Sequence, residues 1–280
     1  GPWESKPMAA EDGSFTGEIA DLQAETEYAV ALEPARSRTY RIVLVEPLRA
    51  SGYEKRIRYP SYTGLAPEKE LSPHGSIAAL FGSEADLMVG VSRGDARGSL
   101  RFDSGRVIPL EAAGEGVLAA SLAIREPGRF RVELSSDAID APPWVSEPYQ
   151  IDPIPDRMPS LYLLAPGEQI DLPPEMRVVL EVDCADDFGI TRLDLVYKRN
   201  NGEPVKMSVA RWQSGSEARV LYPWNLEEIT MAPGDRIGYR LELTDNDVVS
   251  GPKTTVSPEY LIRFPTVEEM YAQQESERQE

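Results

Sequence analysis

The sequence has few of the residues that common catalytic and metal centres require. Its 280 residues include one Cys and one His. A single Cys excludes an intrachain disulfide, and one Cys with one His cannot form the usual zinc sites. The chain also has no phosphate-binding glycine loop and no Gly-x-Ser-x-Gly nucleophile motif. These absences favour a non-enzymatic protein that has no resident cofactor.

Basic residues are also scarce. Lys and Arg number 29 against 47 Asp and Glu, which gives a formal net charge of −18. A phosphate backbone and an anionic lipid surface both require a basic contact surface. The charge therefore excludes nucleic acid as the main partner and leaves other proteins as the expected partners. It does not predict the oligomeric state.

Long hydrophobic runs are missing as well. No stretch reaches the roughly 18 apolar residues of a membrane span, and no signal peptide is visible. Gly1-Pro2 without an initiator Met resembles the scar of a tag-removing protease, and a helical pattern is still running at Glu280. We therefore expect native segments beyond both ends, and any membrane contact would be made through them.

The periodicity that is present is that of β-strands. Short runs alternate apolar with polar residues, as expected for strands with one buried and one solvated face. The 24 Pro and 21 Gly lie mostly between these runs, in turn settings such as Pro127-Gly128. The pattern predicts an all-β protein of immunoglobulin-like sandwiches. The main runs are residues 28–32, 40–45, 101–103, 130–134, 177–182, 193–197 and 239–243.

A two-part motif occurs three times along the chain. An aromatic strand is followed each time by Ser-x-x-Tyr, and the tyrosines lie 109 and 111 residues apart. This spacing is close to the length of one immunoglobulin-like domain, so we assign the two parts to its last two strands, F and G. The aromatic strands are Tyr28-x-Val-x-Leu32, Phe130-x-Val-x-Leu134 and Tyr239-x-Leu-x-Leu243, and the second parts begin at Ser37, Ser146 and Ser257.

The repeat divides the chain into four parts. Residues 48–155 and 156–265 are each long enough for a complete sandwich, and we name them the second and third units. Residues 1–47, the first unit, are too few and form either a truncated domain or a minimal hairpin packed on its neighbour. The stretch 152–159 contains three prolines and is a stiff hinge. Residues 266–280 begin a polar helix, with a capping box formed by Thr266 and Glu269.

Four segments and the start of the helix resemble a known family. They are Tyr59-Pro-Ser-Tyr-Thr-Gly-Leu65, Ala185-Asp-Asp-Phe-Gly-Ile190, Pro233-Gly-Asp235, Asp245-Asn-Asp247 with Ser250-Gly251, and Phe264-Pro-Thr-Val-Glu-Glu. Together they resemble the immunoglobulin-like region of large bacterial membrane proteins of unknown function. The resemblance implies N-terminal membrane helices, tandem sandwiches and a Gln/Glu-rich coiled coil after them. It also implies a periplasmic or other extracytoplasmic location, and it carries over no catalytic residues.

An acidic cluster is the main candidate site. It combines the B–C and F–G loops of the third unit, which share one end of an immunoglobulin-like sandwich with the hinge. Carboxylates that meet there could bind Ca²⁺. In the alternative interpretation they only form turns, and Arg157 neutralises part of their charge. The candidate metal ligands are Asp183, Asp186, Asp187, Asp245 and Asp247.

Other residues have a functional and a structural interpretation. Trp212, Trp224 and Tyr222 could form an aromatic platform for sugars, or they could fill the core between the sheets. His74 lies in a polar loop, and Cys184 ends strand B beside acidic residues that would raise its pKa. A hydrolase would need paired carboxylates in a groove, for which Asp186 and Asp245 are the only suggestion.

These observations predict an extracytoplasmic scaffold of a membrane-anchored protein. Its role would be to space other parts of the protein and to contact protein partners. The alternative is an adhesion module that binds Ca²⁺ at the acidic loops, a carbohydrate, or both.

Overall fold

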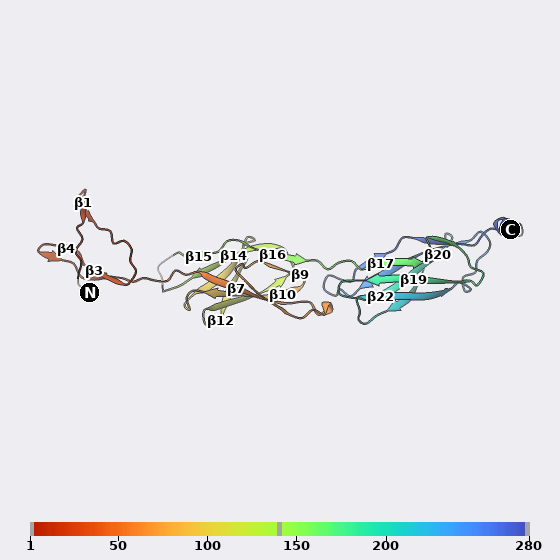
Figure 1. Ribbon diagram of the computed structural model, residues 1–280, viewed down its shortest axis with the longest axis horizontal. Coiled ribbons are helices and arrows are strands. Elements are labelled where there is room, and N and C mark those ends of the chain that lie inside the picture. The colour runs from red at the N-terminus through yellow and green to blue at the C-terminus, as the bar shows by residue number, and fades with distance from the viewer. Residues whose placement is uncertain (1–2, 139–141, 278–280) are drawn as a thin grey trace.

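The computed structural model describes residues 3–138 and 142–277 as an elongated chain of β-domains (Figure 1). The second and third units lie end to end, with the first unit beyond one end and the helix α1, Val267–Glu277, at the other. The prediction of an all-β fold with a short C-terminal helix is confirmed. Within these residues, no helix has the length and apolar character needed to cross a membrane.

The second unit is a two-layer sandwich. One layer has the strand order β8-β7-β10-β13, and the other has β11-β14-β16-β9, with β15 paired to β14. Strand β12 pairs with β11 through its first half and with β13 through its second, so it joins the two layers. The strands are β7 Ala50–Arg58, β8 Glu68–Ser72, β9 Ile77–Leu80, β10 Ser83–Val91, β11 Arg97–Phe102, β12 Val107–Gly114, β13 Val117–Ile124, β14 Gly128–Ser135, β15 Trp144–Val145 and β16 Tyr149–Ile154.

The third unit repeats this plan with two separate sheets. One is β17-β19-β22, and the other is β18-β25-β23-β20-β21 with β24 paired to β23. In both units a short early strand pairs in parallel with strand G, namely β9 with β16 and β18 with β25. The strands are β17 Ser160–Ala165, β18 Gln169–Asp171, β19 Arg177–Ala185, β20 Ile190–Arg199, β21 Val205–Arg211, β22 Glu217–Asn225, β23 Arg236–Asp245, β24 Thr254–Val256 and β25 Tyr260–Arg263.

Each of these two units has its own hydrophobic core. In β10 and in β19 every second residue is buried, because successive side chains of a strand point to opposite faces. The core of the second unit includes Leu87, Leu100 and Phe130. The core of the third unit includes Leu195 and Trp224. The two cores are separate clusters, as expected for domains that fold as individual units.

The repeated motif forms the same hairpin in all three units. The aromatic residue of strand F lies opposite the tyrosine of strand G, and strand G has one extra residue, a β-bulge. The bulged serine pairs both backbone groups of the central residue of strand F. The serine N–H donates to the carbonyl oxygen of that residue, and the serine Oγ accepts its N–H. The central residues and their serines are Val30 with Ser37, Val132 with Ser146, and Leu241 with Ser257, all with N···O distances of 2.8–2.9 Å.

The first unit contains this hairpin without a sandwich around it. Strands β3 (Thr26–Tyr28) and β4 (Ala31–Leu32) pair with β6 (Tyr40–Ile42) and β5 (Ala35–Arg36), respectively. Within residues 3–138 and 142–277, β1 (Ala9–Glu11) pairs only with β2 (Ser14–Thr16). The hairpin lies apart from the second unit (Figure 1). Of the two sequence-based alternatives, the hairpin packed on its neighbour is therefore wrong.

The helix α1 begins as the sequence predicts. The Thr266 N–H donates to Oε2 of Glu269 at 2.8 Å, and the Glu269 N–H donates to Oγ1 of Thr266 at 3.2 Å. This reciprocal pair is a capping box, which satisfies two N–H groups of the first turn. Gly1-Pro2 and residues 278–280, which belong to the two terminal predictions, lie outside the described residues.

We predict that the bulged serine stabilises each complete unit through one buried hydrogen bond. Replacing Ser257 with Ala leaves the N–H of Leu241 buried without an acceptor, which costs about 1–3 kcal/mol. Urea denaturation should therefore show a lower free energy of unfolding for the third unit. Ser214→Ala, at an exposed position of the same unit, is the control and should change it by less than about 0.5 kcal/mol. Equal stability of the two variants would contradict the prediction.

Candidate functional site at the joint between the second and third units

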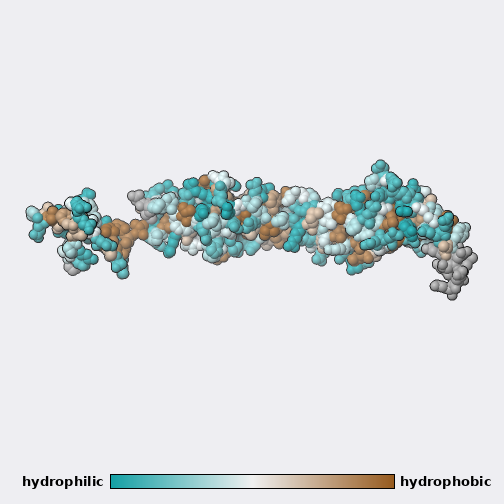
Figure 2. Space-filling model, turned by 90° about the horizontal axis from the view of Figure 1, so that it is seen from above, coloured by the Kyte–Doolittle hydropathy of each residue, from teal (hydrophilic) through white to brown (hydrophobic). Residues whose placement is uncertain are grey.

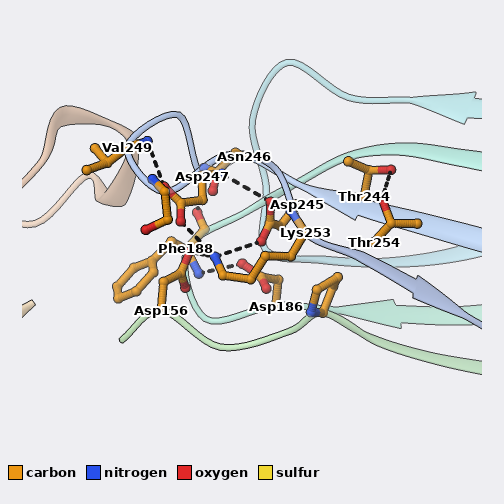
Figure 3. Close-up of polar contacts among 12 residues, drawn as sticks. Asp156, Asp186, Phe188, Thr244, Asp245, Asn246, Asp247, Val249, Lys253 and Thr254 are labelled. Atoms are coloured by element: carbon orange, nitrogen blue, oxygen red, sulfur yellow. Dashed lines mark hydrogen bonds and ion pairs between the residues drawn. The ribbon is translucent and has the colours of Figure 1, made fainter. Parts of the chain in front are cut away.

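The acidic loops meet the linker and the second unit at one joint. The third unit contributes the B–C loop around Phe188 and the F–G loop from Thr244 to Thr254 (Figure 3). The second unit contributes the 3₁₀ turn Ser61–Thr63, which belongs to the Tyr-Pro-Ser-Tyr-Thr-Gly-Leu segment. The linker between β16 and β17 contributes Asp156. The joint thus combines residues far apart in the sequence, such as Tyr62 and Asn246, which are 184 positions apart.

Lys253 is the centre of the acidic cluster. Its Nζ lies 2.8 Å from Oδ2 of Asp156, 2.7 Å from Oδ2 of Asp247 and 3.3 Å from Oδ2 of Asp245. The side chains of Asp245 and Asp247 are fully buried, and that of Asp156 is 2% exposed. Three buried carboxylates would repel one another strongly in a medium of low dielectric constant. The ammonium group offsets part of this charge, so the chain itself supplies a cation to the cluster.

The carboxylates of Asp245 and Asp247 also fix the backbone conformation of the F–G loop. Oδ1 of Asp245 accepts the N–H groups of Asp247 and Lys253, and Oδ1 of Asp247 accepts those of Val249 and Ser250. Asp and Asn favour such turns because a short side chain can bond to the backbone a few residues away. Asp245 and Asp247 therefore each use one oxygen for the backbone and the other for Lys253.

The ionisation of the joint follows from burial and from this ion pairing. Burial would lower the pKa of Lys253, but its hydrogen bonds to Asp156 and Asp247 raise it above the usual range. Burial would raise the pKa of Asp247, but Lys253 and two backbone N–H groups lower it. Lys253 therefore stays charged and Asp247 stays ionised near neutral pH, so the ion pair persists there.

A second set of contacts joins the two units directly. Asn246 donates through Nδ2 to the carbonyl oxygen of Tyr62 at 3.0 Å and to that of Phe188 at 3.3 Å. The rings of Tyr62 and Phe188 meet edge to face, with centroids 6.0 Å apart, and the Tyr62 hydroxyl lies 3.3 Å from Oδ2 of Asp156. Tyr62 therefore links the second unit, the linker and both loops of the third unit.

A close approach of backbone and side chain completes the joint. A Cβ atom on Gly82 would lie 2.5 Å from Cγ1 of Val249, and Gly82 has a positive φ of 86°. Only glycine fits this position without strain. The loop between β9 and β10 can therefore approach the F–G loop of the third unit.

The structure brings together some of the predicted metal ligands but not all of them. Asp245 and Asp247 meet at Lys253, and Asp186 lies beside them, where its Oδ2 accepts the N–H groups of Phe188 and Gly189. Asp183 is exposed on strand β19, and Asp187 is largely exposed. Partial burial of the Asp187 carboxyl and its contact with Asp156 raise the pKa of Asp187. In the described part of the chain, no three His, Cys, Asp or Glu side chains are arranged to hold a metal ion.

The prediction that Arg157 neutralises the cluster is wrong. Arg157 is exposed and makes no ion pair among the residues that the structure describes, whereas Lys253 makes three. Sequence reasoning missed Lys253 and Tyr62. The available signal for Lys253 was its position in the same loop as Asp245 and Asp247. The signal for Tyr62 was its place in the first segment of the family resemblance.

The remaining candidates have structural roles. Trp224 is buried between the sheets, and Trp212 and Tyr222 pack against that core, so the three do not form an exposed platform. Burial and the nearby Asp183 raise the pKa of the Cys184 thiol to about 12, which keeps it unreactive. Exposed His74 lies 3.2 Å from Glu147. Asp245 cannot meet a substrate, because its side chain is fully buried.

Comparisons with known proteins return only distant similarities to solved structures. No known protein family matches the chain, and no curated protein matches it. Among solved structures, the chain is similar to the fibronectin(III)-like modules of Clostridium thermocellum CbhA, at 15% identity and a TM-score of 0.28, over 70% of this chain and 93% of that one. It is also similar to a chimeric titin Z1Z2–Z1Z2 tandem, at 13% identity and a TM-score of 0.24, over 67% and 95% of the two chains.

We predict that Lys253 stabilises the third unit because three buried carboxylates depend on it. Lys253→Met keeps the length of the side chain but removes its charge, and breaking a buried ion pair costs about 3–5 kcal/mol. Thermal unfolding at pH 7 should show a large fall in the melting temperature. Lys198→Met is the matched control, because Lys198 and Glu259 form an exposed pair worth less than about 1 kcal/mol. Similar losses in the two variants would contradict the central role of Lys253.

Proposed function

We propose that the chain is a non-enzymatic spacer and protein-interaction module of a membrane-anchored bacterial protein. It would lie outside the cytoplasm and need no cofactor. The observation that carries the proposal is the joint, where Tyr62, Asp156, Asn246 and Lys253 tie two complete sandwiches end to end. Ligand pockets occur preferentially at domain interfaces, whereas the carboxylates of Asp156, Asp245 and Asp247 at this joint are buried and paired with Lys253.

The contacts of the joint support a fixed angle between the two units. Asn246 and Val249, on one loop of the third unit, contact two separate parts of the second unit, the turn at Tyr62 and the loop at Gly82. Two contacts some distance apart resist bending better than a linker does. The linker adds stiffness, because prolines restrict its backbone. The pair of units would therefore behave as one rod.

The surface of the rod supports contact with proteins. Apolar side chains project from the outer face of the sheet β17-β19-β22, where Tyr162, Val179 and Leu221 are exposed. Strand β22 is also a free edge of that sheet, and such edges accept further strands. The face seen in Figure 2 is mostly hydrophilic, with separate apolar patches, and the net charge of −18 discourages association with nucleic acid and anionic lipid.

Two arguments support the membrane tether and the location. The first is the family resemblance, in which membrane helices precede the sandwiches and a coiled coil follows them. The second is the arrangement in Figure 1, where the first unit and the helix α1 lie at opposite ends of the chain. A rod between them would hold a C-terminal partner at a fixed distance from a membrane anchor.

We predict that loosening the joint makes the rod flexible. Small-angle scattering of the unmodified chain should give an elongated envelope, with the two complete units in line. The double variant Tyr62→Ala with Asn246→Ala removes the ring contact and the hydrogen bonds across the joint, so its distance distribution should broaden. The control is Asn201→Ala with Tyr271→Ala, at two exposed positions away from the joint. A compact globule, or a flexible unmodified chain, would contradict the proposal.

Calcium binding at the joint is a second candidate, supported by one observation. Oδ1 of Asp156, Oδ1 of Asp186 and Oδ1 of Asn246 are buried and have no hydrogen-bond partner among the residues that the structure describes. Oxygen atoms of this kind are ligands that Ca²⁺ prefers. A bound ion would have to share the carboxylate of Asp156 with Lys253.

The calcium candidate predicts stabilisation by the ion. A site with a dissociation constant of about 0.1–1 mM would stabilise the fold by about 1.4–2.7 kcal/mol at about 10 mM CaCl₂. The melting temperature should then rise by several degrees. MgCl₂ at equal concentration controls for ionic strength, and Asp186→Asn should abolish the rise. An unchanged melting temperature in CaCl₂ would exclude this candidate.

A further inference from the structure

The hairpin of the first unit has an apolar face that its counterparts bury. Val30 and Leu32 are 39% and 65% exposed. The residues at the same positions are Val132 and Leu134 in the second unit and Leu241 and Leu243 in the third, and all four are 0% exposed. The equivalence is fixed by geometry, because all three hairpins share the bulged serine and the same strand register.

One edge of this hairpin is also free where its counterparts are paired. In the second unit, strand F pairs on its other side with β11, and Val132 lies opposite Leu100. In the third unit it pairs with β20, and Leu241 lies opposite Leu195. In the described part of the first unit, β3 and β4 pair only with β6 and β5. The first unit therefore presents strands F and G without strand C and without the opposite sheet.

We propose that this hairpin is the acceptor surface for the missing strands of a third immunoglobulin-like sandwich. The occupant is polypeptide on the N-terminal side of the hairpin, because both complete units are built in that order. Phe130 follows Ala50, the first residue of its sandwich, by 80 residues, and Tyr239 follows Ser160 by 79. The same distance before Tyr28 places the start of the occupant upstream of the first residue of this sequence.

The aromatic pair of the hairpin supports the same occupant. Tyr28 and Tyr40 stack with ring centroids 5.3 Å apart. The corresponding pairs, Phe130 with Tyr149 at 5.8 Å and Tyr239 with Tyr260 at 5.4 Å, are also in contact but with tilted rings. An isolated two-stranded hairpin is marginally stable in water, and a sheet needs more strands or a packed face to be stable. The first unit thus keeps the local geometry of a sandwich edge without the core that would stabilise it. This inference does not depend on the spacer function.

Hydrogen exchange measured by mass spectrometry tests the proposal in two forms of the protein. In the 280-residue chain, the amides of residues 30–32 should exchange at least about 100 times faster than those of 132–134 and 241–243. In a full-length native polypeptide that contains the proposed upstream strands, residues 30–32 should become protected to a similar degree. Exposure in both forms would overturn the proposal. Protection of residues 30–32 in the 280-residue chain would overturn the proposal as well. If that protection increased with protein concentration, the occupant of the hairpin would be a second copy of the chain.

A matched pair of variants tests which face is covered. Leu32→Asp places a charge on the apolar face, whereas Ala31→Asp places it on the opposite face, where the counterparts are Glu133 and Glu242. In the full-length polypeptide, Leu32→Asp should abolish the protection of residues 30–32, and Ala31→Asp should leave it intact. In the 280-residue chain neither variant should change the melting temperature. Equal effects of the two variants in the full-length polypeptide would overturn the proposed packing.

Discussion

The bulged hairpin of strands F and G is the constraint on which the rest of the structure depends. One extra residue in strand G would leave the N–H of the central F residue without a partner, and the serine Oγ supplies that partner. The serine thereby fixes the register of the two strands. The register in turn decides which face of strand F enters the core, because a shift of one residue would turn every side chain to the other face.

The same register directs the acidic loop of the third unit toward its neighbour. Strand β23 ends at Asp245 and β24 begins at Thr254, so the loop between them projects from the end of the sandwich at the joint. Burying three carboxylates there is unfavourable unless a cation accompanies them. Lys253 provides this cation from within the loop. The geometry that shapes the loop therefore also sets the charge balance of the joint.

The sequence predicted the parts of the structure that depend on local pattern. The strands, the three hairpins and the capping box at Thr266 each leave a signature within about 20 residues. The role of Lys253 could not be predicted in this way, because its contact with Asp156 spans 97 positions and depends on how the linker folds back. The same holds for Tyr62, which contacts Asn246 across 184 positions. Asp183 was misplaced because the apolar run was taken to end at residue 182, whereas β19 continues to Ala185 and carries Asp183 on its exposed face.

Comparison of the three hairpins also distinguishes the contribution of local hydrogen bonds to stability from the contribution of apolar packing. The hydrogen bonds of the bulge have the same lengths in the exposed first unit as in the two buried ones. What differs is the burial of the apolar residues beside them. Hydrogen bonds exchanged with water contribute little net stability, whereas burial of apolar surface contributes most of it. The hairpin therefore specifies where further strands must pair, and the stability of the first unit depends on the strands that cover it.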